Sequence, residues 1–226
     1  MKNIKTIARL TGLGYLIIFI TGFFGNFYVL ENMVVAGDAI STFENITNNF
    51  ETYNYGVLSF FIMVVIDLLL SWPLYLLFKN INKNLALTSS ILRIINAGIF
   101  FLALKSIIDI SLVNDVRDLT SNLSMQPFID FNIIWNYGLI VFGIHLILLS
   151  QLLYKSELFP RILGLLILLS GIGYIVDSTA QIAINNYIHY KEILESFVIV
   201  AGVLGEFSFT VWLLIKGVKK IEERAI

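Results

Sequence analysis

Six long runs of apolar residues, separated by polar segments, dominate the chain. They cover approximately residues 10–30, 57–78, 85–108, 133–154, 162–184 and 197–215. The hydrocarbon core of a bilayer is about 30 Å thick, so a helix rising 1.5 Å per residue needs roughly 20 apolar residues to cross it. The runs are continuous rather than alternating, and they are too long for the strands of a membrane barrel. The pattern therefore predicts six transmembrane helices.

Composition excludes the other broad classes of protein. Hydrophobic residues make up 58% of the 226 residues and charged residues only 14%, whereas average soluble domains are about 45–50% apolar and about 25% charged. Disordered chains are poor in aliphatic and aromatic residues, so disorder is excluded too. We expect an all-α protein in which residues 1–226 form one six-helix transmembrane domain, with the lipid bilayer as its surroundings.

Two further counts narrow the chemistry. The chain contains no cysteine, which excludes disulfides, thiolate catalysis and cysteine-based metal sites. The net charge is −1, so no bulk attraction to nucleic acid is expected. We predict no nucleic-acid partner and no metal site, and no cofactor is indicated. The oligomeric state is left open.

Basic residues are concentrated on one side of the predicted helices. The N-terminal segment, the second-to-third and fourth-to-fifth connections and the C-terminal segment together carry eleven of them, against three on the opposite side. The positive-inside rule then places both termini in the cytoplasm, in a multi-pass protein of the cell membrane. The first apolar run has no small-residue cleavage site, so we expect it to be an uncleaved span rather than a signal peptide.

A short amphipathic helix is predicted in the first outer connection. Ile40, Phe43, Ile46 and Phe50 recur at helical spacing, and Asp38 precedes them as a plausible N-cap. The helix would lie on the outer face, either as a lid over a cavity or as a connector resting on lipid. The second interpretation is favoured.

Ionisable residues inside the spans are the main candidates for a site. Asp67, Arg93, His145 and Glu206 each lie ten to twelve residues from the nearest cytoplasmic basic residue, or roughly 15–18 Å deep at 1.5 Å per residue. Asp177 lies nearer the outer side. A charge at the centre of a bilayer costs about 2.5–3.5 kcal/mol on insertion scales, so these groups should face the bundle interior.

Arg93 is the fixed cation of this layer, and it should bind at least one carboxylate. Asp67 and Glu206 are both candidates for its partner. Polar residues fall on the same helix faces as the ionisable groups and are expected to support them: Ser71 beside Asp67, Asn96 beside Arg93, Thr210 beside Glu206, and Tyr174 and Gln181 beside Asp177. Glycines at Gly22 and Gly25, and at Gly171 and Gly173, predict close helix packing.

Three functions remain open at this point. The favoured one is a small carrier or binding protein for a polar or amphiphilic ligand, in which Asp67, His145 and Glu206 handle protons and Arg93 is a counter-ion. The second is an intramembrane enzyme acting on lipid, with His145 as general base. The third is a structural or sensory membrane subunit without a site. Five aromatic residues near helix ends are predicted to be interfacial anchors: Tyr28, Trp135, Tyr137, Tyr154 and Tyr187.

Several short segments resemble an uncharacterised bacterial membrane family, the domain of unknown function numbered 4386. They are His145–Leu149, Leu153–Ser156, Phe159–Gly164 and Gly173–Ser178, with Ala8–Gly12, Tyr15–Leu16 and Gly37–Ala39 near the N-terminus. The resemblance extends over nearly the whole chain and implies a multi-helix integral membrane protein of bacteria or related microbes. It implies no activity, cofactor or catalytic residue, although the matching positions include His145 and Asp177.

Overall fold

Six helices long and apolar enough to cross a membrane run through the chain in the computed structural model, which describes residues 2–112 and 124–219. They are Asn3–Met33, Phe50–Phe78, Lys83–Ser111, Gln126–Lys155, Arg161–Ala183 and Lys191–Ile215. The six predicted helices are confirmed, and the described residues contain no strand. Several helices begin well before their apolar run, because polar residues outside the hydrocarbon region extend the same hydrogen-bonded turns.

The first and last spans are interrupted by wider, π-helical turns. The first span consists of α1 (Lys2–Phe23), the π-helical η1 (Phe24–Leu30) and α2 (Glu31–Met33), and α3 (Ala39–Asn48) follows it. The middle spans are α4 (Phe50–Phe78), α5 (Lys83–Ser111), α6 (Gln126–Lys155) and α7 (Arg161–Ala183). After the short η3 (Tyr187–His189), the last span consists of α8 (Lys191–Gly202), the π-helical η4 (Val203–Phe207) and α9 (Ser208–Ile215).

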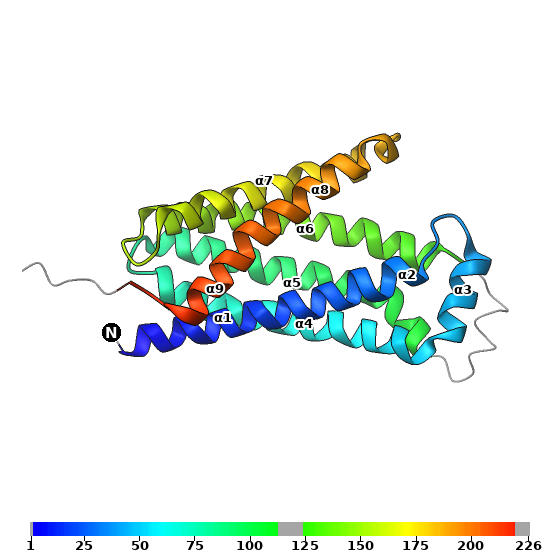
Figure 1. Cartoon of the computed structure of the whole chain (residues 1–226), viewed down its shortest axis with the longest axis horizontal. Coiled ribbons are helices and arrows are strands. Elements are labelled where there is room, and N and C mark those ends of the chain that lie inside the picture. Colours follow the sequence, from blue (N-terminus) through cyan, green and yellow to red (C-terminus); the bar gives the residue numbers. More distant parts are fainter. Residues whose placement is uncertain (1, 113–123, 220–226) are drawn as a thin grey trace, which may run out of the picture.

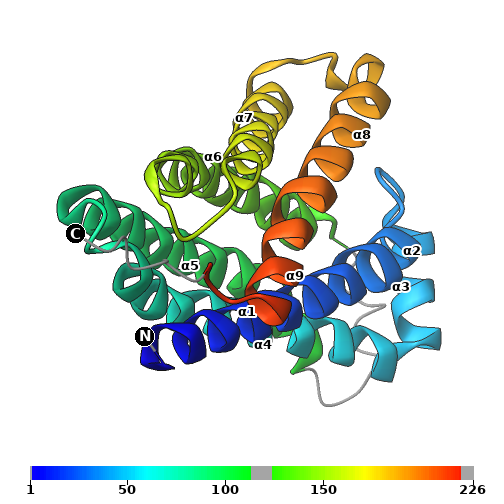
Figure 2. The same cartoon turned by 60° about the vertical axis from the view of Figure 1, so that its left-hand side comes forward.

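Helices that follow one another in the chain pack side by side. The order of contacts is α1, α4, α5, α6, α7 and α8, and α9 closes the bundle by packing against α1. The last span therefore crosses the bundle diagonally, beginning against α7 and ending against α1 (Figures 1 and 2). Its two halves have different neighbours, and this divergence shapes the cavity described below.

The start of α1 and the end of α9 lie at the same end of the bundle, which we call the terminal end (Figure 1). This is the result expected for an even number of crossings. The opposite end, called the distal end here, carries α3 and the connection between α7 and α8 (Figure 1).

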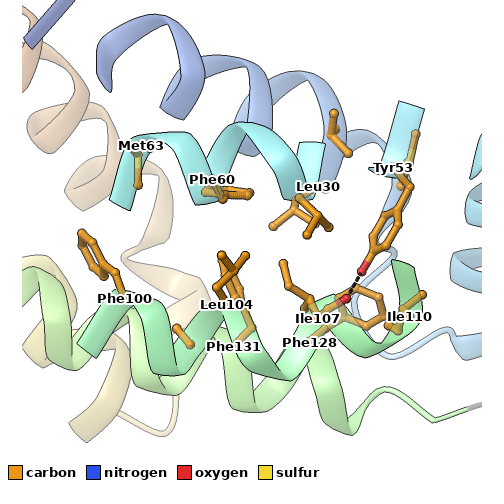
Figure 3. Close-up of a cluster of buried hydrophobic side chains, with 14 of the residues drawn as sticks. Leu30, Tyr53, Phe60, Met63, Phe100, Leu104, Ile107, Ile110, Phe128 and Phe131 are labelled. Atoms are coloured by element: carbon orange, nitrogen blue, oxygen red, sulfur yellow. Dashed lines mark hydrogen bonds between the residues drawn. The ribbon is translucent and has the colours of Figure 1, made fainter. Parts of the chain in front are cut away.

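The apolar interior is divided into two clusters of buried side chains. The distal cluster includes Phe60, Phe100 and Phe131, and the hydroxyl of Tyr53 donates to the carbonyl of Ile107 at its edge, at 3.0 Å (Figure 3). The terminal cluster joins apolar residues of α1, α4, α6, α7 and α9. On α4 the boundary between the clusters falls between Val64 and Leu70. Asp67 is the buried residue within this interval.

Helix α3 confirms the predicted amphipathic helix at the distal end. Asp38 is its N-cap and accepts hydrogen bonds from the backbone N–H of Ser41 at 3.0 Å and from its hydroxyl at 2.6 Å. Phe43 and Ile46 are buried in the distal cluster rather than facing lipid, whereas Ile40 is 62% exposed. The prediction was also wrong for Phe50. Helix α3 ends at Asn48, and Phe50 is the first residue of α4.

The cap makes the start of α3 sensitive to pH. Its hydrogen bonds lower the pKa of Asp38, so the cap stabilises α3 above the unfolded-state pKa and is lost as the pH falls through the lower folded-state pKa. We expect Asp38→Ala to reduce the protection factor of the Ser41 amide at neutral pH, measured by hydrogen exchange. Acidification should then reduce protection in the wild type but not in Asp38→Ala. Equal protection in both proteins at neutral pH would contradict the cap.

Glycines allow the closest helix contacts, as predicted. A Cβ at Gly25 would lie 2.8 Å from the Ser59 hydroxyl of α4, and one at Gly143 would lie 2.6 Å from the carbonyl oxygen of Gly171. The backbones of α6 and α7 therefore meet directly at Gly143 and Gly171.

Candidate functional site

Arg93 on α5 is the centre of a polar cluster that joins four helices. Its side chain is fully buried, and each guanidinium nitrogen has a partner. Nη2 forms an ion pair with Oδ1 of Asp67 at 2.5 Å, and Nε donates to the Asp67 carbonyl at 3.3 Å. Nη1 faces the hydroxyl of Tyr15 at 3.0 Å and Nε2 of His145 at 3.1 Å. Of the two predicted acidic partners for Arg93, the structure selects Asp67.

Asn96 completes the coordination of Asp67. It lies three residues after Arg93, so both side chains leave α5 toward α4. Its Nδ2 donates to Oδ2 of Asp67 at 3.0 Å, and both oxygens of that carboxylate therefore have a donor. A buried ion pair is tolerated when such additional hydrogen bonds satisfy the remaining lone pairs.

The hydrogen bonds around His145 define where its ring proton lies. Nδ1 is 2.8 Å from the carbonyl oxygen of Ser89, which can only accept, so Nδ1 is the protonated nitrogen. Arg93 can only donate, so Nε2 accepts from it. His145 is fully buried, and both of its ring nitrogens are occupied within the cluster.

Aromatic rings enclose the guanidinium. The Arg93 Cζ lies 4.8 Å from the centre of the Tyr15 ring and 5.6 Å from that of Phe142. Both distances are within the range of cation–π attraction. Tyr15 was missed as a site residue at the sequence level, because a phenol within an apolar run gives no charge signal.

Glu206 lies outside this cluster, on η4 of the last span. Its Oε1 accepts from the hydroxyl of Tyr174 on α7 at 2.9 Å. Thr210 donates to the backbone carbonyl of Glu206 at 2.7 Å rather than to its carboxylate. Glu206 is half-buried, and no ion pair involves it among the described residues.

Asp177 belongs to a separate network toward the distal end. Its carboxylate accepts from Gln181 at 2.9 Å and from the hydroxyl of Tyr187 at 2.6 Å, and Asn136 donates to Gln181 at 3.1 Å. Burial and this hydrogen bond raise the pKa of Tyr187, so its hydroxyl stays protonated and donates. Ser71 joins neither group, because its hydroxyl donates to the carbonyl of Leu68 one turn before it.

The two π-helical segments have backbone carbonyls whose partners are side chains. Asn32 donates to the carbonyls of Phe27 and Tyr28 in η1, at 2.8 and 3.1 Å. Ser170 of α7 donates to the carbonyl of Ala201 just before η4, at 2.7 Å. Such side chains stabilise a wide turn by satisfying carbonyls that leave the regular ladder. Segments of this kind occur often at functional sites, and both border the cavity.

A cavity of about 630 Å³ lies between the first and last spans, with α6 and α7 behind it. Its deep end reaches Asp67, Glu206 and Thr210, together with the hydroxyl-bearing rings of Tyr15 and Tyr174. Glu31, Lys191 and Glu195 line it at the distal end, where Lys191 and Glu195 form an ion pair at 3.6 Å. Figure 2 shows that α8 diverges from α1 and packs against α7. The cavity lies between these two diverging spans. Arg93 and His145 do not line it.

Aromatic side chains form most of the wall between the two ends. Trp135 stacks on Phe100 with 3.9 Å between ring centres, and it also contacts Phe131 at 5.2 Å. The prediction that Trp135 is an interfacial anchor was wrong, because it faces the interior in the third turn of α6. Asn132, Asn136 and Gln181 add a polar strip on the same side of the cavity.

The site does not have the composition of a metal centre. Within residues 2–112 and 124–219, no three His, Asp or Glu side chains lie close enough to share a metal ion. The cavity instead offers four carboxylates, several hydroxyl and amide groups, and a large aromatic surface. These groups can hold a small molecule that has both a polar and an apolar part.

Comparisons with known proteins identify a family and supply no activity. The model of the family described as "Domain of unknown function (DUF4386)" matches residues 10–217. An uncharacterised protein of the archaeon Archaeoglobus fulgidus is 32% identical over 174 residues, which cover 75% of this chain and 87% of that protein. No solved structure matches the chain. The match over nearly the whole length shows that this multi-pass membrane protein belongs to the DUF4386 family.

Proposed function

We propose that this protein binds a small amphiphilic molecule in the cavity between its first and last spans, as a carrier or binding protein of the cell membrane. Both termini are placed in the cytoplasm and the distal end outside, following the distribution of basic residues. The observation that carries the proposal is the cavity of about 630 Å³ that joins the distal end to Asp67 and Glu206. Its volume falls within the range of about 300–1,000 Å³ typical of small-molecule sites.

The different surroundings of the two carboxylates support a binding function over a structural one. Asp67 is saturated by Arg93 and Asn96, as expected of a group that holds helices together. Within the described part of the chain, the carboxylate of Glu206 has one hydrogen bond, from Tyr174, and it lines the cavity. Because an acidic group in a membrane span is costly, a carboxylate that contributes so little to packing favours a functional role.

The same geometry argues against an enzyme that uses His145 as general base. A general base must come within hydrogen-bonding reach of the proton that it removes. His145 is fully buried, has both ring nitrogens engaged and does not line the cavity. Under the proposed function, proton exchange with the cavity would fall to Glu206, and His145 would position Arg93.

Filling the deep end of the cavity should test the proposal. A Cβ at Gly202 would lie 3.3 Å from the Tyr174 hydroxyl and 3.7 Å from Oε1 of Glu206. Gly202→Leu would therefore place its side chain beside the groups expected to bind the ligand. We expect native mass spectrometry of the wild type, gently released from its membrane, to show a retained small molecule that Gly202→Leu loses.

The matched control is Gly98→Leu. A Cβ at Gly98 meets no atom within 4 Å and the residue is exposed, so this variant adds the same volume outside the cavity. It should retain the small molecule at the wild-type level. A wild type of bare polypeptide mass, or equal retention in both variants, would contradict binding in this cavity.

A further inference from the structure

The charges around the deep end of the cavity do not balance. Arg93 and Asp67 neutralise each other in one ion pair, and His145 contributes no charge in the arrangement described above. The other ion pair of the described residues, Lys191 with Glu195, lies at the distal end. Among the described residues, the carboxylate of Glu206 is therefore left without a cationic partner, and it borders the cavity.

The Glu206 carboxylate also has unused hydrogen-bonding capacity. Oε1 accepts from Tyr174, whereas Oε2 has no hydrogen-bond partner among residues 2–112 and 124–219. Both oxygens of Asp67, by contrast, already have donors. A ligand that donates hydrogen bonds at this depth would find its acceptor at Glu206.

Aromatic rings surround the same position. Phe142 and Tyr174 line the cavity and contact each other edge to face, with 5.4 Å between ring centres. The Phe19 ring also lines the cavity, and it lies 5.2 Å from the ring of Phe207, the residue after Glu206. Faces of aromatic rings attract ammonium groups, most strongly when water is excluded.

An anionic ligand would find no free cation at this depth. Arg93 is fully buried behind Asp67 and Tyr15 and does not line the cavity. Lys191 lines the cavity only at the distal end, where Glu195 already pairs with it. The deep end of the cavity therefore favours a cationic ligand over an anionic one.

We propose that the ligand of this cavity is an organic cation, an amine or ammonium group joined to an apolar body, and that Glu206 is its counter-ion. The inference rests on the ligand-binding function proposed above and adds the chemical class of the ligand. The ammonium group would lie at Glu206 between the rings of Tyr174 and Phe19. The apolar body would extend toward the distal end along Phe100 and Trp135.

Three probes with one apolar body and different charge test this inference: phenethylamine, phenethyl alcohol and phenylacetate. Their saturable binding to the full chain in lipid nanodiscs can be measured by isothermal titration calorimetry at neutral pH. We expect the wild type to bind the amine at least about tenfold more tightly than the alcohol, as a charge-assisted hydrogen bond and cation–π contact imply. Phenylacetate should bind most weakly.

Two variants of Glu206 test whether its negative charge, rather than the fold of the cavity, causes the preference for the amine. Glu206→Gln should bind the amine and the alcohol about equally, whereas Glu206→Asp, which keeps the charge, should retain the preference for the amine. Glu192→Gln is the matched control, since Glu192 lies on α8, is exposed and does not line the cavity. It should preserve the wild-type ratio of affinities.

The outcomes distinguish the two proposals. If the alcohol binds the wild type as tightly as the amine does, a cavity site exists but its ligand is not a cation, as expected if Glu206 carries a proton. If Glu206→Gln keeps the preference for the amine, Glu206 is not the counter-ion. If no probe shows saturable binding, the binding function itself is contradicted.

Discussion

Replacing Arg93 by Met is expected to destabilise the bundle by about 3–5 kcal/mol, the usual cost of leaving a buried charge without its partner. Asp67 would keep only the hydrogen bond from Asn96 in a site 4% exposed. The contacts of Arg93 with Tyr15 and His145 would be lost as well, so α1 and α6 would lose a polar link to α5. The measurement is the free energy of unfolding in mixed detergent micelles, with the thermal midpoint as a second readout.

A double variant distinguishes the cost of the unpaired Asp67 charge from the cost of the lost Arg93 packing. Asp67→Leu combined with Arg93→Met removes both charges, and we expect it to recover much of the stability lost in Arg93→Met. Lys83→Met removes an exposed cation from the start of the same helix and should change the stability by less than about 0.5 kcal/mol. If Arg93→Met is as stable as Lys83→Met, the ion pair does not hold the bundle together.

Gly143→Leu is expected to have an effect of similar size for a steric reason. Its Cβ would lie 2.6 Å from the carbonyl oxygen of Gly171 and 2.6 Å from Cγ1 of Ile175. A carbonyl within a helix cannot rotate away, so α6 and α7 must separate along their contact. Overpacking costs about 1–3 kcal/mol where side chains can adjust, and we expect at least the upper value here.

The readout for Gly143→Leu is the fraction of protein extracted as a single folded species, together with its thermal midpoint. Gly98→Leu again serves as the control, because its added side chain enters open space. The combination of Gly143→Leu with Gly171→Leu should cost less than the sum of the two single changes, since the helices have already separated after the first. Strict additivity would argue against a direct contact between the two glycines.

The membrane fold could be predicted from hydropathy because lipid leaves the backbone few alternatives. A chain that cannot hydrogen-bond to water must satisfy its own peptide groups, and continuous apolar runs of this length do so as helices. The cost of a charge in lipid predicted that Asp67, Arg93 and His145 face the bundle interior, and the structure brings these three side chains together. Asn96 was predicted as a supporting polar residue from its spacing to Arg93 on the helix, and in the structure it donates to Asp67.

Other features depend on tertiary contacts, which hydropathy does not contain. Glu206 was predicted to share a layer with Arg93, yet the partner of Arg93 is Asp67, because η4 and the diagonal last span direct Glu206 toward the cavity and Tyr174. Neither π-helical segment has a signature in the pattern of apolar residues. Trp135 was assigned to the interface because the apolar run of its helix was predicted to begin at residue 133, whereas α6 begins at Gln126.

The Arg93–Asp67 pair also bears on how this chain enters a membrane. The two residues lie on adjacent helices, α4 and α5, whose connection is only the short segment 79–82. They can therefore meet as soon as this hairpin closes, before α1 or α6 has docked. A lone arginine arriving at the bilayer centre would carry the full insertion penalty of a charge. Delivered as a hairpin, the two charges enter as a single neutral unit, so that the chain can be inserted during its synthesis without waiting for the distant parts of its sequence.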